Sequence, residues 1–248
     1  MLADLAIHTP SAGALGAGTL AARLSLRRLV DFVAEQLASW RGHPERPPAE
    51  SETQLNAQLC SYLNGAARRS ALDAIQFCAE VPDESHRGRR LDLAVLPCGT
   101  TLRIEGRRYN EFETLLPIEC KRLPTPADDR RRGEREYVIG AEATTAGGIQ
   151  RFKLGAHGAA HAIAVLIGYV QAGTAEQWRG TINGWMAELA DADALWNDER
   201  LERLEAVGRD GSGDHAAPVA RFVSVHRRDD ASTRTIELQH LWIDMRAP

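Results

Sequence analysis

The longest apolar run of the chain, residues 162–170, limits the fold more than any other segment. It is far shorter than the ~20 apolar residues that cross a membrane as a helix. A short run that is apolar at nearly every position is typical of a strand buried on both faces of a sheet. The run therefore predicts a central strand in an α/β protein.

Helical patterns lie on both sides of this run. Residues 19–40 repeat leucine and valine at near-helical spacing and precede a polar stretch with prolines at 42–50. A capping box at 51–54 starts a second helix that continues to about residue 64, and another at 174–177 starts a helix with an apolar stripe. A further helix is expected at 144–157, in spite of its glycines.

Strand patterns fill the segment between the second helix and the apolar run, and they return at the end of the chain. Short runs bounded by turn residues predict an antiparallel meander, and two longer ones predict a terminal hairpin around residues 228–232. A charged helix is expected before this hairpin, at 195–207. The strands are expected at residues 74–81, 90–97, 101–105, 113–121, 219–227 and 233–245.

The order of these elements is an α/β arrangement around one core. At ~150 residues per domain, a chain of 248 residues holds one large domain or one domain with a small addition. We expect an N-terminal helical extension and linker at 1–50 and the main α/β domain at 51–190. Residues 191–248 are expected to form a C-terminal helix and β-hairpin packed on that domain.

Composition excludes several classes of protein. Hydrophobic residues make up 44% of the chain and charged residues 26%, which excludes a mainly disordered chain. Asp4 and His8 stand where a signal peptide needs a basic start and an apolar core, so we expect a cytoplasmic protein without a membrane partner. The net charge of −4 means that any nucleic-acid binding is local.

The four cysteines, Cys60, Cys78, Cys98 and Cys120, include no CxxC pair and lie in apolar contexts. This pattern argues against a disulfide framework and against a zinc site. We expect buried, reduced thiols.

Charged residues stand at the ends of two predicted strands. Asp92 lies near the start of one strand, and Glu119, Cys120 and Lys121 end another. Because strand side chains alternate, Glu119 and Lys121 point to one side and Cys120 to the other. Carboxylate oxygens hold Mg²⁺ with most of its waters, and a lysine beside them can orient such a water or help to deprotonate it. The group therefore predicts hydrolysis of a phosphodiester.

In these residues the chain resembles the PD-(D/E)xK phosphodiesterase superfamily, the nucleases with the restriction-endonuclease-like fold. The resemblance covers about residues 51–171 and consists of Asp92, the Glu119-x-Lys121 pattern, and the order helix, three strands, helix, strand. Leu91 stands where the name of the motif has a proline. The implied fold is a restriction-endonuclease-like core with the N-terminal helix and the C-terminal helix and hairpin as additions.

The resemblance also implies roles for particular residues. Asp92, Glu119 and the backbone carbonyl of Cys120 would hold Mg²⁺, for which Mn²⁺ can substitute. Lys121 would serve the attacking water.

The resemblance also implies roles for two residues on the predicted helices. Glu52 would add a carboxylate to the metal site, directly or through water, although an acid in a first helical turn is explained equally well by the helix dipole. Gln150 would be the glutamine of an exonuclease-type QxxxY pattern, in which this chain has Leu154 in place of tyrosine.

Basic side chains flank the expected site. Arginines precede Asp92, and the stretch 121–135 has six basic residues against three acidic ones. Positive loops beside a carboxylate site suit a phosphate backbone, which they bind without regard to sequence. A solvated charged loop also explains each run taken alone. The candidate nucleic-acid-binding residues are Arg89, Arg90, Arg122, Arg130, Arg131, Arg151 and Lys153.

Other catalytic motifs are missing or incomplete. His157 and His161 have the spacing of a zincin, but Gly158 stands where a zincin helix has its glutamate. The sequence has no GxxxxGK[ST] phosphate loop and no GxSxG elbow. A separate ATPase or sensor subunit would therefore have to supply any step driven by ATP.

These features predict a metal-dependent endonuclease that acts on DNA, in restriction, antiphage defence or repair. The preference for DNA over RNA comes from the resemblance alone. One catalytic centre cuts one strand, so a double-strand break would require a homodimer or sequential nicking. Two alternatives stay open: a catalytically inactive nucleic-acid-binding or scaffold protein that keeps the nuclease fold, and a metal-dependent hydrolase of small phosphate esters, which the basic runs disfavour.

Overall fold

The structure is a computed structural model that describes most of the chain. The predictions for residues 19–24, for Arg130 and Arg131, and for most of the helix expected at 195–207 lie outside its described residues. The described residues are 25–49, 51–84, 88–126, 133–141, 147–193, 195–196, 205–206, 219–228 and 233–246.

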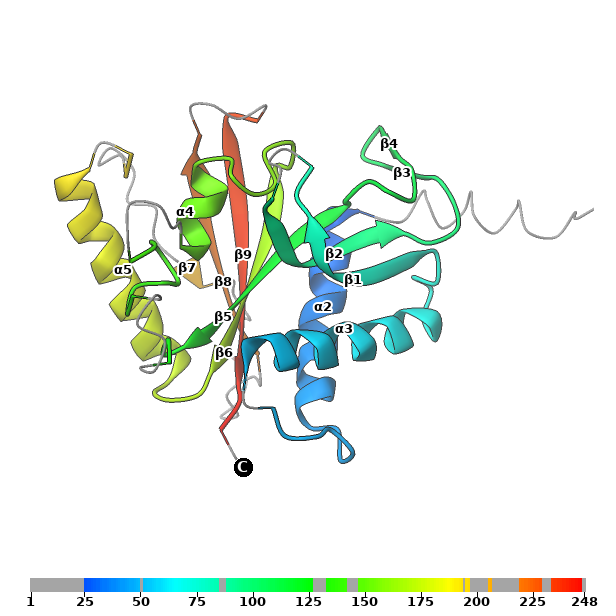
Figure 1. The fold of residues 1–248 in the computed structure, drawn as a ribbon, viewed down its shortest axis with the longest axis horizontal. Helices are drawn as coiled ribbons and strands as arrows, with labels where there is room; N and C mark the ends of the chain where they lie inside the picture. The colour runs from blue at the N-terminus through cyan, green and yellow to red at the C-terminus, as the bar shows by residue number, and fades with distance from the viewer. Residues whose placement is uncertain are drawn as a thin grey trace, which may run out of the picture.

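One mixed β-sheet runs through the described part of the molecule (Figure 1). Its strand order is β1-β2-β5-β6-β9-β8-β7, with six longer strands and the two-residue β7 at one edge. The pairs β5/β6 and β6/β9 are parallel, and the other pairs are antiparallel. The strands are β1 Ile75–Pro82, β2 Arg90–Pro97, β5 Leu116–Leu123, β6 Ile163–Val170, β9 Thr235–Asp244, β8 Val219–Arg227 and β7 Glu205–Ala206.

Helices cover both faces of this sheet, as the apolar run predicts. On β6, Val165 and Ile167 belong to one hydrophobic cluster, while Ala164 and Leu166 belong to another on the opposite face. Successive side chains of a strand point to opposite faces, so a strand in the middle layer must be apolar at every position. The first cluster contains α2 (Leu26–Arg41) and α3 (Glu52–Arg68), and the second contains α4 (Gly148–Lys153) and α5 (Ala175–Ala192). The α/β class predicted from the sequence is confirmed.

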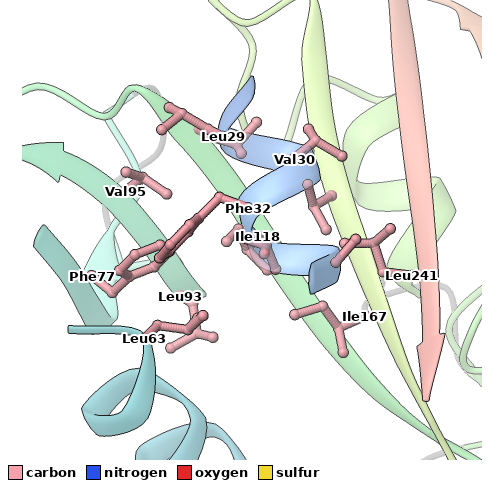
Figure 2. Packing of buried hydrophobic residues seen from close by; sticks show 14 of the residues in the cluster. Leu29, Val30, Phe32, Leu63, Phe77, Leu93, Val95, Ile118, Ile167 and Leu241 are labelled. Atoms are coloured by element: carbon pink, nitrogen blue, oxygen red, sulfur yellow. The ribbon is translucent and has the colours of Figure 1, made fainter. Parts of the chain in front are cut away.

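Helix α2 is part of the main core. Figure 2 shows Leu29, Val30 and Phe32 directed towards residues of α3 and of the sheet, including Ile118 and Leu241. Leu29 has none of its surface exposed, and Val30 has 1%. Residues 26–41, which we expected to extend the core, therefore contribute to it directly.

Three expectations from the sequence need correction. The strand expected at 101–105 is not part of a meander: β3 (Leu102–Ile104) and β4 (Arg107–Tyr109) form a separate two-stranded sheet. The helix expected at 144–157 is the six-residue α4, because Gly155 and Gly158 take positive φ angles of 63° and 58° that end it in turns. Glu205–Ala206, inside the helix expected at 195–207, is strand β7.

The terminal hairpin is confirmed, but it lies within the sheet instead of on its surface. Strand β9 pairs with the central strand β6 along its length, and β8 pairs with β9. The hairpin and the apolar run thus form one continuous ladder.

A chain of buried polar side chains ties this hairpin to the segment 133–141. Tyr137 Oη accepts a hydrogen bond from Trp242 Nε1 at 2.7 Å and lies 2.8 Å from His240 Nδ1. Ser224 Oγ lies 2.8 Å from His240 Nε2 and 2.7 Å from His226 Nε2. Burial and the neighbouring His226 hold the pKa of His240 well below its usual value, so the ring of His240 is neutral. Ser224 and His226 are both buried in this network.

Two further findings concern classes of protein considered from the sequence. All four cysteines are free thiols, of which Cys120 is buried and Cys98 is exposed, against the expectation that all are buried. Among the described helices, none is both long enough and apolar enough to cross a bilayer.

Gly168 in β6 allows the close approach of β9. The two strands pair Gly168 with Trp242, and a Cβ atom at position 168 would lie within 3.0 Å of the indole ring. Gly168→Ala should therefore lower the free energy of unfolding by about 1–3 kcal/mol through overpacking. Denaturant unfolding measures this change.

Gly180→Ala is the matched control. Gly180 is exposed in the middle of α5, and a Cβ atom there would meet nothing within 4 Å. The same substitution should raise the free energy of unfolding by about 0.5–1 kcal/mol, because alanine is the better helix former. Equal effects at the two positions would contradict the packing described for Gly168.

Candidate active site

Strands β2 and β5 pair over a short stretch and then separate. Their antiparallel ladder ends at the pair Leu93 and Ile118, while β5 stays paired with β6 on its other edge as far as Leu123. Successive N–H groups of a strand point to opposite edges. The N–H groups of Cys120 and Arg122 therefore face the edge that β2 has left. We call this place, where β2 has parted from β5 beyond Leu93 and Ile118, the fork.

Two carboxylates take the place of the missing strand at the fork. Asp92 Oδ2 accepts a hydrogen bond from Cys120 N at 2.8 Å, and Glu52 Oε2 accepts one from Arg122 N at 3.2 Å. Glu52 is the first residue of α3, whose start is fixed by the capping box predicted at 51–54. Backbone N–H groups that are shielded from water need acceptors, so both carboxylates have a structural reason to be here.

The ammonium group of Lys121 lies among the carboxylates. Its Nζ is 2.9 Å from Glu119 Oε1 and 3.5 Å from both Glu52 Oε1 and Asp92 Oδ2. A fourth carboxylate, Glu136 Oε1, lies 4.0 Å from the same nitrogen. Lys121 is only 3% exposed, so these charges interact with little screening by water. The structure thus brings together Glu52, Asp92, Glu119 and Lys121, which the sequence singled out.

The alternation predicted along β5 is confirmed. Glu119 and Lys121 lie on the same face of the strand and form an ion pair, whereas Cys120 lies in the hydrophobic cluster of α2 and α3 on the other face. The carbonyl oxygen of Cys120 accepts a hydrogen bond from Lys121 Nζ at 2.9 Å, so it too borders the ammonium group.

Glu119 is the most buried member of the group, with none of its surface exposed. Its Oε1 accepts a second charged hydrogen bond, from Arg151 Nη1 at 2.5 Å. Its Oε2 lies 3.4 Å from His157 Nδ1, and among the described residues neither atom has a hydrogen-bond partner. One oxygen of this carboxylate therefore contacts two cationic groups, and the other lies near the imidazole of His157 alone among the described contacts.

Charge interactions outweigh burial at Glu119 and Lys121. Burial alone would raise the pKa of Glu119, but the Lys121 ammonium, the His157 imidazole and the Arg151 guanidinium hold it well below its usual range. Burial would lower the pKa of Lys121, but the carboxylates of Glu119, Asp92 and Glu52 raise it well above its usual value. At neutral pH this pair is therefore fully ionised.

Asp92 behaves in the opposite way. Burial, and then the negative charge of Glu119, raise the pKa of Asp92 to about 7, although Lys121 and the N–H of Cys120 oppose the shift. The two carboxyl groups therefore differ in protonation: Glu119 stays charged, while Asp92 exchanges a proton near neutral pH.

No family model, curated protein or solved structure matches this chain. The chemistry of the site therefore has to be argued from its own geometry.

The donor set suits a hard divalent cation in part. Carboxylate oxygens and a backbone carbonyl are the ligands that Mg²⁺ prefers, and Glu119 Oε2 is a buried oxygen without a hydrogen bond. In the part of the chain that the structure describes, however, no three carboxylate, imidazole or thiol side chains are grouped so that they could hold one metal ion. The Lys121 ammonium occupies the space between the carboxylates and compensates their charge.

Gln150 binds backbone N–H groups instead of contributing to the site as expected. Its Oε1 accepts hydrogen bonds from Gly140 N at 3.2 Å and Gly147 N at 3.3 Å. The side chain thus caps α4 and holds the preceding segment, and it lies outside the group around Lys121. The exonuclease-type role suggested for Gln150 gains no support from this position.

The candidate basic residues fall into different environments. Arg89 and Arg90 are exposed at the start of β2, beside Asp92. Arg122 Nε donates a hydrogen bond to Gln171 Oε1 at 2.7 Å, at the carboxyl ends of β5 and β6. Lys153, in contrast, is 1% exposed and lies over the ring of Trp196 at 5.4 Å. Lys153 is therefore not at the surface, against the expectation of a phosphate-binding side chain.

Three members of the site were missed or misjudged from the sequence. Arg151 was expected to contact phosphate, but it is the ion-pair partner of Glu119. His157 was considered only for a zincin pattern, and Glu136 was not considered. His157 and Glu136 lie in turns, where no periodicity marks the direction of a side chain.

The raised pKa of Asp92 makes stability depend on pH. An aspartate in the unfolded chain has a pKa of ~3.9, so between about pH 4 and 7 the folded protein binds one proton more, and its stability falls as the pH rises. From about pH 5 to 8, in buffer with a chelator, the wild type should lose ~2–3 kcal/mol of unfolding free energy relative to Asp92→Asn. The asparagine can still accept the Cys120 N–H bond.

The control for this measurement is Asp73→Asn, at an exposed turn position before β1. Its unfolding free energy should follow the wild type across the same pH range. If Asp92→Asn also runs parallel to the wild type, the carboxyl of Asp92 does not titrate near pH 7 in the folded state.

Lys121→Met tests whether the ammonium holds the carboxylates together. Removing a buried cation from three carboxylates leaves uncompensated charge, which should cost about 3–5 kcal/mol of unfolding free energy at pH 8 in the presence of a chelator. Arg122→Met is the matched control on the next residue, which is half-exposed, and should cost about 1 kcal/mol. Equal losses for the two variants would contradict a central position for Lys121.

Proposed function

We propose that this chain is a metal-dependent phosphodiesterase that cuts nucleic acid at the fork between β2 and β5. The observation that carries the proposal is the convergence of three carboxylates within 3.5 Å of Lys121 Nζ. They come from α3, β2 and β5, three elements far apart in the sequence. Carboxylates that surround one lysine next to a partly open edge are suited to phosphodiester hydrolysis.

The charge balance of the site supports a divalent cation. Four carboxylates, from Glu52, Asp92, Glu119 and Glu136, lie within 4.0 Å of one ammonium group, and Arg151 adds a second positive charge. A divalent cation such as Mg²⁺ would add positive charge among these carboxylates. The ligands would be Asp92, Glu119 and the carbonyl of Cys120, with Glu52 reaching it directly or through water, and the ion would supply a water of lowered pKa and charge for the phosphate.

The remaining chemistry belongs to the side chains. Because the pKa of Lys121 is raised, its Nζ stays protonated at neutral pH and can donate a hydrogen bond to an attacking water or to a phosphate oxygen. The carboxyl of Asp92, with a pKa of about 7 in the metal-free protein, would release its proton on binding the cation, so metal binding would strengthen as the pH rises through 7. Arg151 keeps Glu119 charged and fixes its orientation.

The order of elements supports the same proposal. Helix α3, strands β1, β2 and β5, helix α4 and strand β6 follow one another as the restriction-endonuclease-like core requires. The sheet order β1-β2-β5-β6, antiparallel and then parallel, agrees with a meander followed by a crossover. We therefore infer that the mixed sheet is a restriction-endonuclease-like fold in which β9, β8 and β7 extend the core.

DNA is the proposed substrate, and Arg89 and Arg90 are the proposed first contacts with its backbone. Both are exposed at the end of β2 that carries Asp92, where they can hold phosphates next to the site. Cleavage of both strands would use a homodimer or two successive nicks. Restriction, antiphage defence or repair is the proposed setting, and a separate ATPase or sensor subunit would supply any energy-driven step.

One observation favours a second candidate, a scaffold or nucleic-acid-binding protein that keeps the fold without catalysis. Asp92 and Glu52 each accept a backbone N–H bond from β5, so both are needed to close the sheet edge whether or not the site is active. A scaffold would explain these two bonds, but it gives no role to the buried Oε2 of Glu119.

Cleavage assays with matched variants distinguish the two candidates. The wild type, Asp92→Asn and Glu176→Gln are incubated with supercoiled plasmid, linear duplex, single-stranded DNA and RNA, with Mg²⁺ or Mn²⁺ and with a chelator. Asp92→Asn should lose cleavage by at least about 100-fold, because it removes a metal ligand and a titrating group while keeping the bond to β5. Glu176→Gln, which changes an exposed acid on α5, should cut like the wild type.

A titration with metal ions shows how to interpret an assay in which no substrate is cut. Mg²⁺ should raise the unfolding temperature of the wild type and of Glu176→Gln, and it should raise that of Asp92→Asn less, because only a ligand bound to the folded state stabilises it. If Mg²⁺ and Mn²⁺ leave all three proteins unchanged and none of the four substrates is cut, the scaffold hypothesis replaces the nuclease.

A further inference from the structure

A second concave site lies on the α2 and α3 side of the molecule. It has a volume of about 320 Å³ and lies between the end of α2, the residues after it and the middle of α3. This volume is at the lower end of the range of ligand pockets, ~300–1,000 Å³. Its lining residues include Trp40, Arg46, Gln58 and Tyr62, and none of its lining residues takes part in the group around Lys121.

Aromatic rings form much of the wall. The rings of His43 and Tyr62 meet edge to face with centroids 5.9 Å apart, and Trp40 lies alongside. His43 is exposed and Tyr62 half-buried, so their faces are accessible, whereas Trp40 is 1% exposed and forms the base. The accessible face of such a ring can hold a flat ring by stacking.

Two polar atoms in this wall lack hydrogen-bond partners. Trp40 Nε1 is a donor and Gln58 Oε1 an acceptor, and both are buried with no partner among the described residues. Gln58 Nε2, in contrast, donates to the carbonyl of Pro47 at 3.2 Å, which fixes the side chain. Buried polar groups without partners are rare in folded proteins and call for an explanation. One donor and one acceptor among the side chains that line one pocket match the edge of a nucleobase, which carries both.

Charged groups stand at the rim of the same pocket. The Arg46 guanidinium lies 5.2 Å from the centre of the Trp40 ring, so its charge is held over the pocket, and Glu45 is exposed beside it. A guanidinium binds a phosphate, and a carboxylate accepts hydrogen bonds from sugar hydroxyls. The groups that would bind the ring, the sugar and the phosphate thus lie next to each other in one pocket.

We propose that this pocket binds a nucleotide, with the base stacked on the accessible ring of Tyr62 and its edge directed towards Trp40 Nε1 and Gln58 Oε1. The base can belong to a free mononucleotide or to an unpaired position of a single strand, because both present the same ring, edge and phosphate. The proposal depends on this pocket alone and does not require that the Lys121 site cuts nucleic acid.

Isothermal titration of the full-length protein tests it. The probes are the four 5′-monophosphates AMP, GMP, CMP and UMP, a short single-stranded oligonucleotide, and phenyl phosphate, which has a ring and a phosphate but no base edge. A chelator in every buffer prevents cleavage and metal-dependent binding at the fork. We expect the nucleotides or the oligonucleotide to bind, and phenyl phosphate to bind at least about tenfold more weakly, because it cannot pair with the two buried polar atoms.

Three variants locate the binding. Tyr62→Ala removes a stacking ring and should weaken binding by about tenfold. Gln58→Met keeps the length of the side chain, removes its polar atoms, and should reduce the differences in affinity among the four nucleotides. Arg68→Ala, an exposed position at the end of the same helix and outside the pocket, is the control and should bind like the wild type. The unfolding temperature of each variant shows that it is folded.

Each outcome of the titrations supports or overturns the proposed nucleotide site. Binding of a mononucleotide that Tyr62→Ala weakens supports a free nucleotide as the ligand, and binding of the oligonucleotide alone, weakened in the same way, supports a strand. Phenyl phosphate that binds as well as every nucleotide would overturn the assignment of a nucleobase. So would the absence of binding at millimolar concentration, or binding that Tyr62→Ala and Gln58→Met leave unchanged. The Lys121 site is judged separately by cleavage and by Mg²⁺, so failure at one site does not decide the other.

Discussion

The separation of β2 from β5 is the constraint on which the site depends. Beyond Leu93 and Ile118 the ladder is open, and two N–H groups of β5 need acceptors. Carboxylates of Asp92 and Glu52 supply them, which brings negative charge to a place with little water. The Lys121 ammonium compensates that charge. The unpaired edge thus accounts for the positions of Asp92, Glu52 and Lys121.

How far the sequence predicts this arrangement depends on where regular structure ends. Alternation along β5 is enough to place Glu119 and Lys121 on one face, and a capping box is enough to place Glu52 at a helix start. Both patterns are local and both are confirmed. Arg151 and His157 could not be predicted as partners of Glu119, because α4 ends after six residues and the turns that follow direct these side chains.

The fold, too, is predicted by the sequence where a local pattern determines it and not where long-range packing does. An apolar run predicts a strand covered on both faces, and β6 is such a strand, with Val165 and Leu166 in clusters on opposite sides. No local pattern shows which strand will lie beside it. Strand β9 pairs with β6 from a distant part of the sequence, and α2 enters the main core although its amphipathic pattern indicates only that one face is buried. Pairing and docking partners are decided by packing, which a single sequence does not display.

Folding alone explains some of the charges at the fork but not all of them. The carboxylates of Asp92 and Glu52 close the edge of β5, and the Lys121 ammonium lies close to both. Glu119 is instead the ion-pair partner of Lys121 and Arg151, and its Oε2 lies 3.4 Å from His157 Nδ1. A buried ion group is costly unless its charges are matched, and apolar residues of similar size would stabilise the fold better. Under the proposed function, the binding of a cation and a phosphate would account for this cost in stability.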